Sequence, residues 1–209
     1  MIFEQKTVRL KYSIIHFISY EKFDPDSYLH ILTQEEHERY FGFSNLNRKK
    51  EFIATRYLRH QIFGFEHIHY DSNGAPYIRN EGYISISHTP GIVGIALNNE
   101  FRIGLDIETR SEKAKRVYKK FLSENEQKLF NVMDPDTMTI AWSAKETLYK
   151  IAGRKQIEFK SELSLRPKEL GVLIGGINTK GIHPTTEIHT FVEDSYVFCI
   201  NESALSPEI

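Results

Sequence analysis

The chain has 209 residues, of which 40% are hydrophobic and 26% are charged. This balance excludes an intrinsically disordered chain, and the length suits one large or two small globular domains. The formal net charge is only −1, so the molecule has no overall basic field and we expect no nucleic-acid partner. An anionic ligand would have to be bound by a local cluster of cations.

The N-terminus and the cysteine content indicate the compartment. Residues 1–6 lack the features of a secretory signal, and nowhere do 18 apolar residues stand together, so we expect a cytoplasmic protein without a membrane partner. The single cysteine, Cys199, lies in an apolar run that is typical of a buried strand. We therefore expect neither an internal disulfide nor a catalytic thiol.

Two helices are predicted in the first half of the chain. Thr33 and Glu36 form a capping box, in which each side chain bonds the backbone amide of the other residue, and this pattern begins a helix. A longer helix is predicted from about Asn47 to Phe63, before Gly64. Short alternating runs separated by turns then continue to residue 108, and they predict a mainly antiparallel sheet.

The second half repeats this order of elements. Ser123 and Glu126 form a second capping box, and a second long helix is predicted between Asp134-Pro135 and Gly153. Equivalent residues of the two halves lie 87 to 90 positions apart, and short strands follow the second long helix as well. Because capping boxes are common, a chance similarity is the alternative to a true repeat.

The repeat predicts an α+β fold of two pseudo-symmetric halves, residues 1–101 and 102–209. Each half would pack a long helix on a mainly antiparallel sheet. A cleft between two such halves is the natural place for a ligand.

The run from Arg102 to Glu108 reads as a strand, in which successive side chains point to opposite faces. Asp106 and Glu108 then share a face with Gly104, which leaves room beside them. Two carboxylates on one face form an oxygen-rich site suited to a hard cation such as Mg²⁺. The alternative is a solvated strand end, so a metal site needs a third ligand.

The second long helix offers that ligand. On a helical projection, Trp142, Glu146 and Lys150 lie opposite the apolar stripe. The alternative is that Glu146 and Lys150 form a surface ion pair and that the tryptophan covers a neighbouring loop. Beside Asp106 and Glu108, however, Glu146 would be a third carboxylate and Lys150 a cation for a phosphate group.

His88 ends the alternating strand 83–87, just before a turn. At that position its ring, the Thr89 hydroxyl and the turn amides are suitable donors to a phosphate. A purely structural histidine is the alternative.

A basic run follows the two strand carboxylates. Residues 110–120 contain six basic side chains against a single acidic one. Such a run is often only a solvated helix, but it would also attract and orient an acidic partner.

Three segments together resemble the signature blocks of the surfactin-synthetase-activating 4′-phosphopantetheinyl transferases. They are Ser85–Thr89, Gly104–Glu108 and Trp142–Lys150, the last of the form W-x-x-K-E-x-x-x-K. Segments 48–59 and 73–76 extend the resemblance to nearly the whole chain. Members of that family are monomers built from two α+β halves, so the resemblance implies the same fold and a monomer here.

The resemblance implies transfer of the 4′-phosphopantetheine group of coenzyme A to a serine of an acyl or peptidyl carrier protein, with release of adenosine 3′,5′-bisphosphate. It implies Mg²⁺, with Mn²⁺ as the alternative metal, on Asp106, Glu108 and Glu146. Glu146 and Lys150 would be the catalytic residues. Glu146 would accept the proton of the serine, directly or through a metal-bound water, and Lys150 would neutralise the leaving phosphate.

Other implied contacts are with the phosphates of coenzyme A. His88 and Thr89 match positions that bind these phosphates, and Arg48 and Arg56 match a basic pair on the first long helix. Lys150 would also touch coenzyme A. The first half would thus hold the nucleotide, and the second half the metal and, on residues 110–120, an acidic helix of the carrier protein.

One residue departs from the family pattern. The usual G-K-P reads Gly74-Ala75-Pro76 here, so a lysine that contacts the nucleotide is missing. Either another cation, such as Arg79 or Lys49, replaces it, or the affinity for coenzyme A is weaker. Ala75 also favours a first alternative, a relative that binds coenzyme A or a carrier without transfer, while a second alternative is a metal-dependent pyrophosphohydrolase that uses water as the acceptor.

Overall fold

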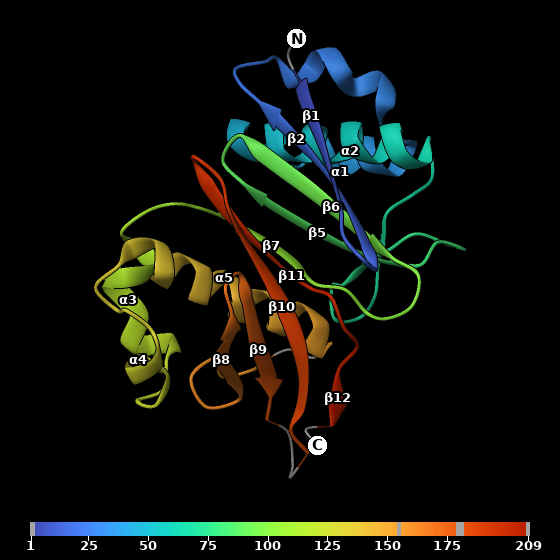
Figure 1. The fold of residues 1–209 in the computed structure, drawn as a ribbon. Coiled ribbons are helices and arrows are strands. Elements are labelled where there is room, and N and C mark those ends of the chain that lie inside the picture. The colour runs from blue at the N-terminus through green and yellow to red at the C-terminus, as the bar shows by residue number, and fades with distance from the viewer. Residues whose placement is uncertain (1–2, 154–155, 179–181, 208–209) are drawn as a thin grey trace.

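Two antiparallel sheets face each other and carry helices on their outer sides (Figure 1). The computed structural model describes residues 3–153, 156–178 and 182–207. The α+β class predicted from the sequence is confirmed.

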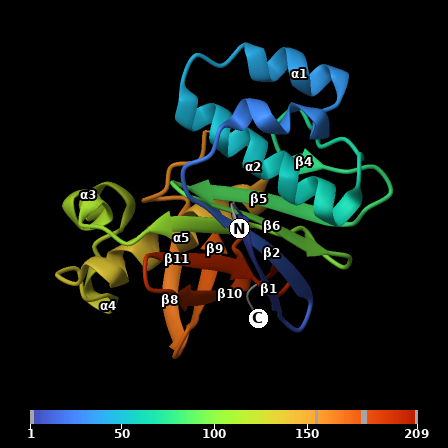
Figure 2. The same ribbon diagram turned by 90° about the horizontal axis from the view of Figure 1, so that it is seen from above.

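The N-terminal half forms the first sheet and the helices above it. Its elements are β1 (Phe3–Arg9), β2 (Ser13–Tyr20), the 3₁₀ helix η1 (Pro25–Ile31), α1 (Gln34–Phe41), α2 (Leu46–Phe63), β3 (His69–Tyr70), β4 (Pro76–Tyr77), β5 (Tyr83–Thr89) and β6 (Ile92–Asn98). The main sheet has the strand order β1-β2-β6-β5, while β3 and β4 form a separate hairpin. Seen from above, α1 and α2 lie on one side of this sheet (Figure 2).

The C-terminal half forms the second sheet. Its elements are β7 (Leu105–Thr109), α3 (Lys113–Phe121), α4 (Glu126–Leu129), α5 (Pro135–Ala152), β8 (Leu163–Glu169), β9 (Val172–Ile177), β10 (Pro184–Val192), β11 (Tyr196–Asn201) and β12 (Ser206–Pro207). The strand order is β7-β11-β10-β9-β8, with β12 beside β10. The long helix α5 packs on this sheet, and α3 and α4 lie beyond one end of it (Figure 1).

Strand alternation divides most apolar side chains of the two sheets among three of the four buried apolar clusters, and the fourth is a small one formed by Ile68, Ile78 and Ile84. On β6, Val93 and Ile95 face the helices of the first half, whereas Ile92 and Ala96 face the second sheet. Likewise Cys199 of β11 packs under α5, while its neighbours belong to the core between the sheets. Each sheet is therefore covered on both faces, and the two halves share one apolar interface.

The repeat extends to buried ion pairs. Both predicted capping boxes are present, at Thr33 and Glu36 and at Ser123 and Glu126. Each capping glutamate is buried and reaches a cation on the long helix of its half. Glu36 lies 2.9 Å from Arg56, and Glu126 lies 2.9 Å from Lys145.

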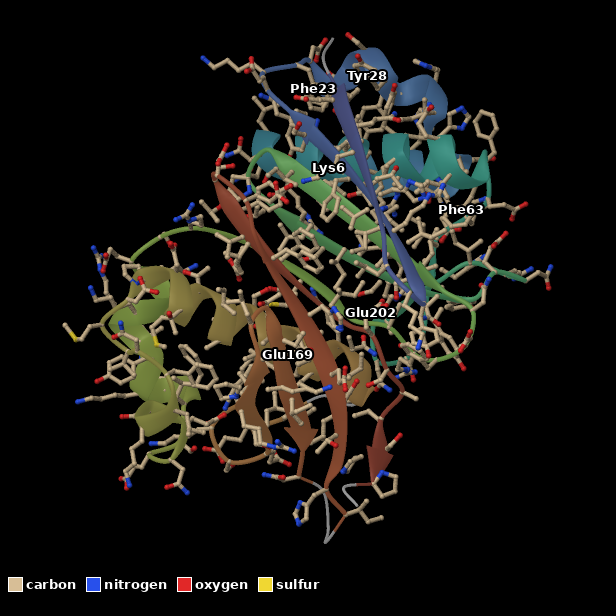
Figure 3. The ribbon with its side chains drawn as sticks, viewed as in Figure 1. Lys6, Phe23, Tyr28, Phe63, Glu169 and Glu202 are labelled. Carbon is tan, nitrogen blue, oxygen red and sulfur yellow. The ribbon has the colours of Figure 1, made fainter. Side chains whose placement is uncertain are left out.

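Polar contacts also join the halves along one flank. Lys6 of β1 lies 2.7 Å from Glu193, which follows β10. The amide of Tyr12 donates to the carboxylate of Glu202 at 3.0 Å. Lys6 and Glu202 are labelled in Figure 3.

The structure departs from the predicted elements at several strands. Neither β1 nor β2 was expected. The alternation after the second long helix also predicts a strand at 157–159, but the first strand there is β8 at Leu163–Glu169. The strand expected from residue 102 begins at Leu105 and belongs to the second sheet. The expected division at residues 101 and 102 falls in the connection between β6 and β7. No helix among the described residues is long and apolar enough to cross a membrane.

Candidate active site

The site forms where the edge strands β5 and β7 of the two sheets meet. At this junction the backbone amides of β7 donate hydrogen bonds to side-chain hydroxyls of β5, and not to its backbone carbonyls. Ser85 Oγ accepts a hydrogen bond from the amide of Leu105 at 2.9 Å, and Ser87 Oγ accepts one from the amide of Ile107 at 3.1 Å. The junction fixes β7, which carries two of the candidate metal ligands.

Asp106 projects from β7 away from the inter-sheet core and is 5% exposed. Its Oδ1 accepts a hydrogen bond from Lys150 Nζ of α5 at 2.9 Å and another from Ser87 Oγ at 3.3 Å. Its Oδ2 is buried and has no hydrogen-bond partner among the described residues. Lys150 Nζ also donates to the carbonyl of Leu105 at 2.6 Å, so this lysine ties α5 to β7.

Glu108 lies two residues further along β7 and binds the tryptophan of α5. Trp142 Nε1 donates to Glu108 Oε1 at 2.8 Å. The indole also stacks on Phe159 and meets the edge of Phe121. Burial raises the pKa of Glu108, and the nearby charge of Asp106 raises it further. The tryptophan therefore both covers a loop and holds a carboxylate.

Glu146 is the third carboxylate and comes from α5, one turn after Trp142. Burial raises the pKa of Glu146 to about 7, with Asp106 as the next largest cause and Lys150 acting in the opposite direction. Glu108 also raises it. The negative charge of Asp106 therefore acts on both Glu108 and Glu146.

These carboxylates are not already grouped around one point. In the part of the chain that the structure describes, no three His, Cys, Asp or Glu side chains are placed as a ready metal site. In this arrangement Lys150 takes up one oxygen of Asp106, and Trp142 binds Glu108. The expected convergence of all three on one cation therefore stays a prediction.

The chemistry of the residues nevertheless fits a hard divalent cation. Oδ2 of Asp106 is buried without a partner within the described residues, and the pKa values of Glu108 and Glu146 are raised by burial and by neighbouring negative charge. A cation would relieve both conditions, because oxygen ligands suit Mg²⁺ and a positive ion favours the ionised carboxyl groups. Asp106, Glu108 and Glu146 are the residues that would hold it.

Lys145, next to Glu146 in the chain, has a different role. It is completely buried, and its ammonium contacts Glu126 and the carbonyl oxygens of Phe121, Phe159 and Leu163 within 3.0 Å. These bonds fix α5 against the preceding and following segments. Lys145 thus sets the position of the helix from which Glu146 and Lys150 project.

A cationic cavity of about 200 Å³ lies beside His88. It is lined by Arg39, Arg48, Arg56 and His88, with Glu51 as the acidic member. Arg48 Nη1 lies 3.3 Å from His88 Nε2, so the structure brings these two expected phosphate contacts together. Burial lowers the pKa of His88, and the charges of Arg48 and Lys150 lower it further against the opposing effect of Glu51.

Arg39 is the residue of this cavity that the sequence analysis missed. It lies in the last turn of α1, and its guanidinium rests over the rings of Phe52 and Tyr70. Its position six residues after the Thr33 cap gave no signal, because a basic residue in the last turn of a helix is usually explained by the helix dipole. Only the packing of α1 on α2 brings it to the cavity.

Arg56 and Thr89 are placed differently from the expected ligand contacts. Arg56 is 3% exposed, donates to Glu36 at 2.9 Å and lies over Phe52, so its charge is compensated even though it lines the cavity. Thr89 is buried, and its hydroxyl lies 2.7 Å from that of Thr109. Thr89 lines neither cavity and acts in the junction of the sheets.

A larger cavity of about 410 Å³ lies between the halves. Its lining includes Tyr77, Tyr83 and Ala75 from the first half and Arg102, Tyr149 and Lys150 from the second. It shares Gly74, Pro76 and Ile86 with the cationic cavity. The two cavities are therefore adjacent, and together they extend from Arg48 to the lysine beside Asp106.

The cations near Ala75 are not the ones expected to replace the missing lysine. Arg102 and Lys150 line the larger cavity, whereas Arg79 and Lys49 line neither. The ammonium of Lys49 lies over the ring of Tyr40, 4.7 Å from its centre. Arg102 is therefore the better placed substitute.

Comparison with known families gives one match. Residues 102–200 match the model of the 4′-phosphopantetheinyl transferase superfamily. The matched segment contains Asp106, Glu108, Glu146 and Lys150. This match supports the superfamily and a phosphopantetheinyl transfer activity in general. No curated protein matches the chain.

The matched segment also contains the basic run, most of which forms α3. Arg110 is paired with Asp136 and also donates to two carbonyl groups, while Lys115 pairs with Glu112. The remaining basic side chains form no ion pair within the described residues: Lys113, Arg116, Lys119 and Lys120. Ala114 and Phe121 are buried, so α3 is a helix with one apolar and one basic face. The charge of Lys113 opposes the rise in the pKa of Glu108 that burial causes, so the basic face acts on one of the carboxylates.

Proposed function

We propose that this chain is a cytoplasmic, monomeric 4′-phosphopantetheinyl transferase of the surfactin-synthetase-activating type. It moves the phosphopantetheine group of coenzyme A to a serine of an acyl or peptidyl carrier protein and releases adenosine 3′,5′-bisphosphate. The observation that carries the proposal is the arrangement around Asp106. A buried carboxylate has one oxygen bonded to a lysine and the other without a partner among the described residues, and its charge acts on two further carboxyl groups. It lies within the segment that matches the superfamily, and its lysine lines the larger cavity.

In this proposal the cationic cavity binds the nucleotide phosphates of coenzyme A. Arg48 and His88 donate to a phosphate, and the guanidinium of Arg39 lines the same cavity. The larger cavity offers the rings of Tyr77, Tyr83 and Tyr149 to apolar or aromatic parts of the substrate. Because the cavities adjoin, one extended molecule can reach from Arg48 to Lys150.

In this proposal the carboxylate site would hold a divalent cation. Mg²⁺ held by Asp106, Glu108 and Glu146, with Mn²⁺ as the alternative, supplies stabilisation of negative charge on the leaving phosphate. Lys150 adds a second positive charge at the same place. For this it must exchange part of its present bonding to Asp106 for the phosphate.

The reaction then needs one proton acceptor. The serine oxygen attacks the phosphorus on the pantetheine side, the bond from that phosphorus to the bridging oxygen breaks, and the serine proton goes to Glu146. Glu146 is the candidate for this role because its carboxyl group lies close enough to Asp106 and Lys150 for their charges to act on it. The carrier approaches over α3, whose basic face complements an acidic helix.

Ala75 supports a second candidate, a relative that binds coenzyme A or a carrier without transfer. A hydrolase that uses water as the acceptor is a third. Release of adenosine 3′,5′-bisphosphate from coenzyme A, measured with and without an apo carrier, separates them. Release that requires the carrier supports transfer. Equal release without the carrier supports hydrolysis, and coenzyme A binding without any release supports the binding protein.

A further inference from the structure

The hydroxyl group of Ser87 has its full set of hydrogen bonds. It accepts from the amide of Ile107 at 3.1 Å and from Lys150 Nζ at 3.2 Å, and it lies 3.3 Å from Asp106 Oδ1. A hydroxyl has one donor and two acceptor positions. Since the amide and the ammonium can only donate, the hydrogen of Ser87 must point to Asp106.

This assignment explains why the two oxygens of Asp106 differ. Oδ1 receives hydrogen bonds from Ser87 and Lys150, whereas the buried Oδ2 receives none from the described residues. A carboxylate held through one oxygen keeps its plane fixed and presents the other oxygen to a ligand.

We propose that Ser87 is a positioning residue of the carboxylate site, whose hydroxyl holds Asp106 Oδ1 and Lys150 so that Oδ2 of Asp106 faces the metal. The inference rests on the proposed function for the assumption that a metal ion binds here. The hydrogen bonds of Ser87 to Asp106 and Lys150 do not depend on that function. Ser87 belongs to the first half of the chain and precedes His88 of the cationic cavity. Through Ser87, the N-terminal half orients Asp106, the candidate metal ligand on β7 of the C-terminal half.

The chain contains a matched control two residues earlier. Ser85 is also buried on β5, and its hydroxyl accepts from a β7 amide at 2.9 Å, in the same way as Ser87. It has no hydrogen bond to a carboxylate or a lysine within the described residues. Replacing either serine removes one bond between the sheets, but only the change at Ser87 affects Asp106 and Lys150.

The test compares Ser87→Ala with Ser85→Ala in the full chain. Both variants should lose a few degrees of melting temperature, because each leaves a buried amide without an acceptor. In calorimetric titration with Mg²⁺ or Mn²⁺, Ser87→Ala should bind the metal about 10-fold more weakly. Ser85→Ala should stay within twofold of the parent, and Ser87→Thr, which keeps the hydroxyl, should recover most of the binding. If Ser87→Ala does not fold, Ser87→Cys takes its place, since a thiol is a weak donor.

Metal-free crystal structures of the variants provide a readout that is independent of the proposed function. The Asp106 carboxylate should turn or become disordered in Ser87→Ala and keep its orientation in Ser85→Ala. An unchanged carboxylate in Ser87→Ala, or equal loss of metal binding in both variants, would overturn the positioning role. If the parent chain binds no divalent metal, the proposed metal site fails, and the carboxylate orientation alone decides the role of Ser87.

Discussion

Trp142 Nε1 donates a hydrogen bond of 2.8 Å to Glu108 Oε1. This bond joins α5 to β7 at the carboxylate site, while the indole is wedged between Phe121 and Phe159. The tryptophan therefore lies opposite the apolar stripe of its helix because it bonds Glu108, a candidate metal ligand, and packs between these two rings, and not because the helix is exposed there.

Replacing Trp142 by phenylalanine should separate its hydrogen bond to Glu108 from its ring packing on Phe159. Trp142→Phe keeps an aromatic ring against Phe159 but removes the donor to Glu108, so the Mg²⁺ concentration for half-maximal transfer should rise several-fold. Phe159→Leu removes the stacking partner and keeps the donor, and should lower the melting temperature with little change in metal dependence. The support role of Trp142 is wrong if both variants show the same Mg²⁺ titration as the parent.

Glu146 should make the metal-free protein less stable as the pH rises. Its pKa in the folded state, about 7, lies above the ordinary value of 4.5. Between these pH values the folded state binds more protons than the unfolded state, so the free energy of unfolding falls. We expect a loss on the order of 1–2 kcal/mol between pH 5 and pH 8, after allowance for screening by solvent.

Chemical denaturation across this pH range, in the presence of a chelator, measures the effect. Glu146→Gln should remove most of the pH dependence, since its amide does not titrate. A parent chain whose stability is constant or rises from pH 5 to pH 8 would show that burial and neighbouring negative charge do not raise the pKa of Glu146.

His88 and Arg39 should determine the affinity for coenzyme A. His88→Ala and Arg39→Ala each remove a side chain that lines the cationic cavity, so each should raise the Michaelis constant for coenzyme A by about 10-fold. The Michaelis constant for the carrier should change much less. Thr89→Val is the control, because the Thr89 hydroxyl bonds Thr109 and should affect stability alone. The opposite result, a larger effect on the carrier constant, would place His88 in the docking surface.

The basic face of α3 should attract the carrier. Arg116→Glu with Lys120→Glu should raise the Michaelis constant for the carrier at low salt, and the difference from the parent should shrink at high salt, since exposed charges are screened beyond a Debye length of about 8 Å at physiological ionic strength. Lys11→Glu with Lys22→Glu makes the same charge change on the first half and should have little effect. Equal carrier modification by the α3 variant and the parent at low salt would mean that the carrier docks elsewhere.

The sequence predicted the parts of the fold that depend on local signals. The long helix α5 has the Asp134 cap, the proline in its first turn and the left-handed Gly153 that were expected. The strand β2 was missed because Ile15, Phe17 and Ile18 are buried on both of its faces, so no alternation marks it. The edge strand β1 was missed because most of its residues are exposed and polar.

The sequence could predict those site residues whose placement depends only on the face of a single strand or helix. Asp106 and Glu108 do lie opposite the inter-sheet core, as strand alternation requires. Arg56 could not be judged in this way, because its partner Glu36 lies 20 residues earlier and only the packing of α1 on α2 joins them. For the same reason, the free oxygen of Asp106 could not be foreseen: it depends on Ser87, from the other half of the chain.

The most direct test of the account is the intact mass of an apo carrier protein after incubation with the chain, coenzyme A and Mg²⁺. We expect the carrier to gain one phosphopantetheine group on a serine, with the gain lost in the presence of a chelator or with Asp106→Ala. Asp106→Ala should still fold and bind coenzyme A, because Asp106 lies outside the apolar cores. An unmodified carrier across acyl and peptidyl types, with coenzyme A bound but intact, would contradict the account.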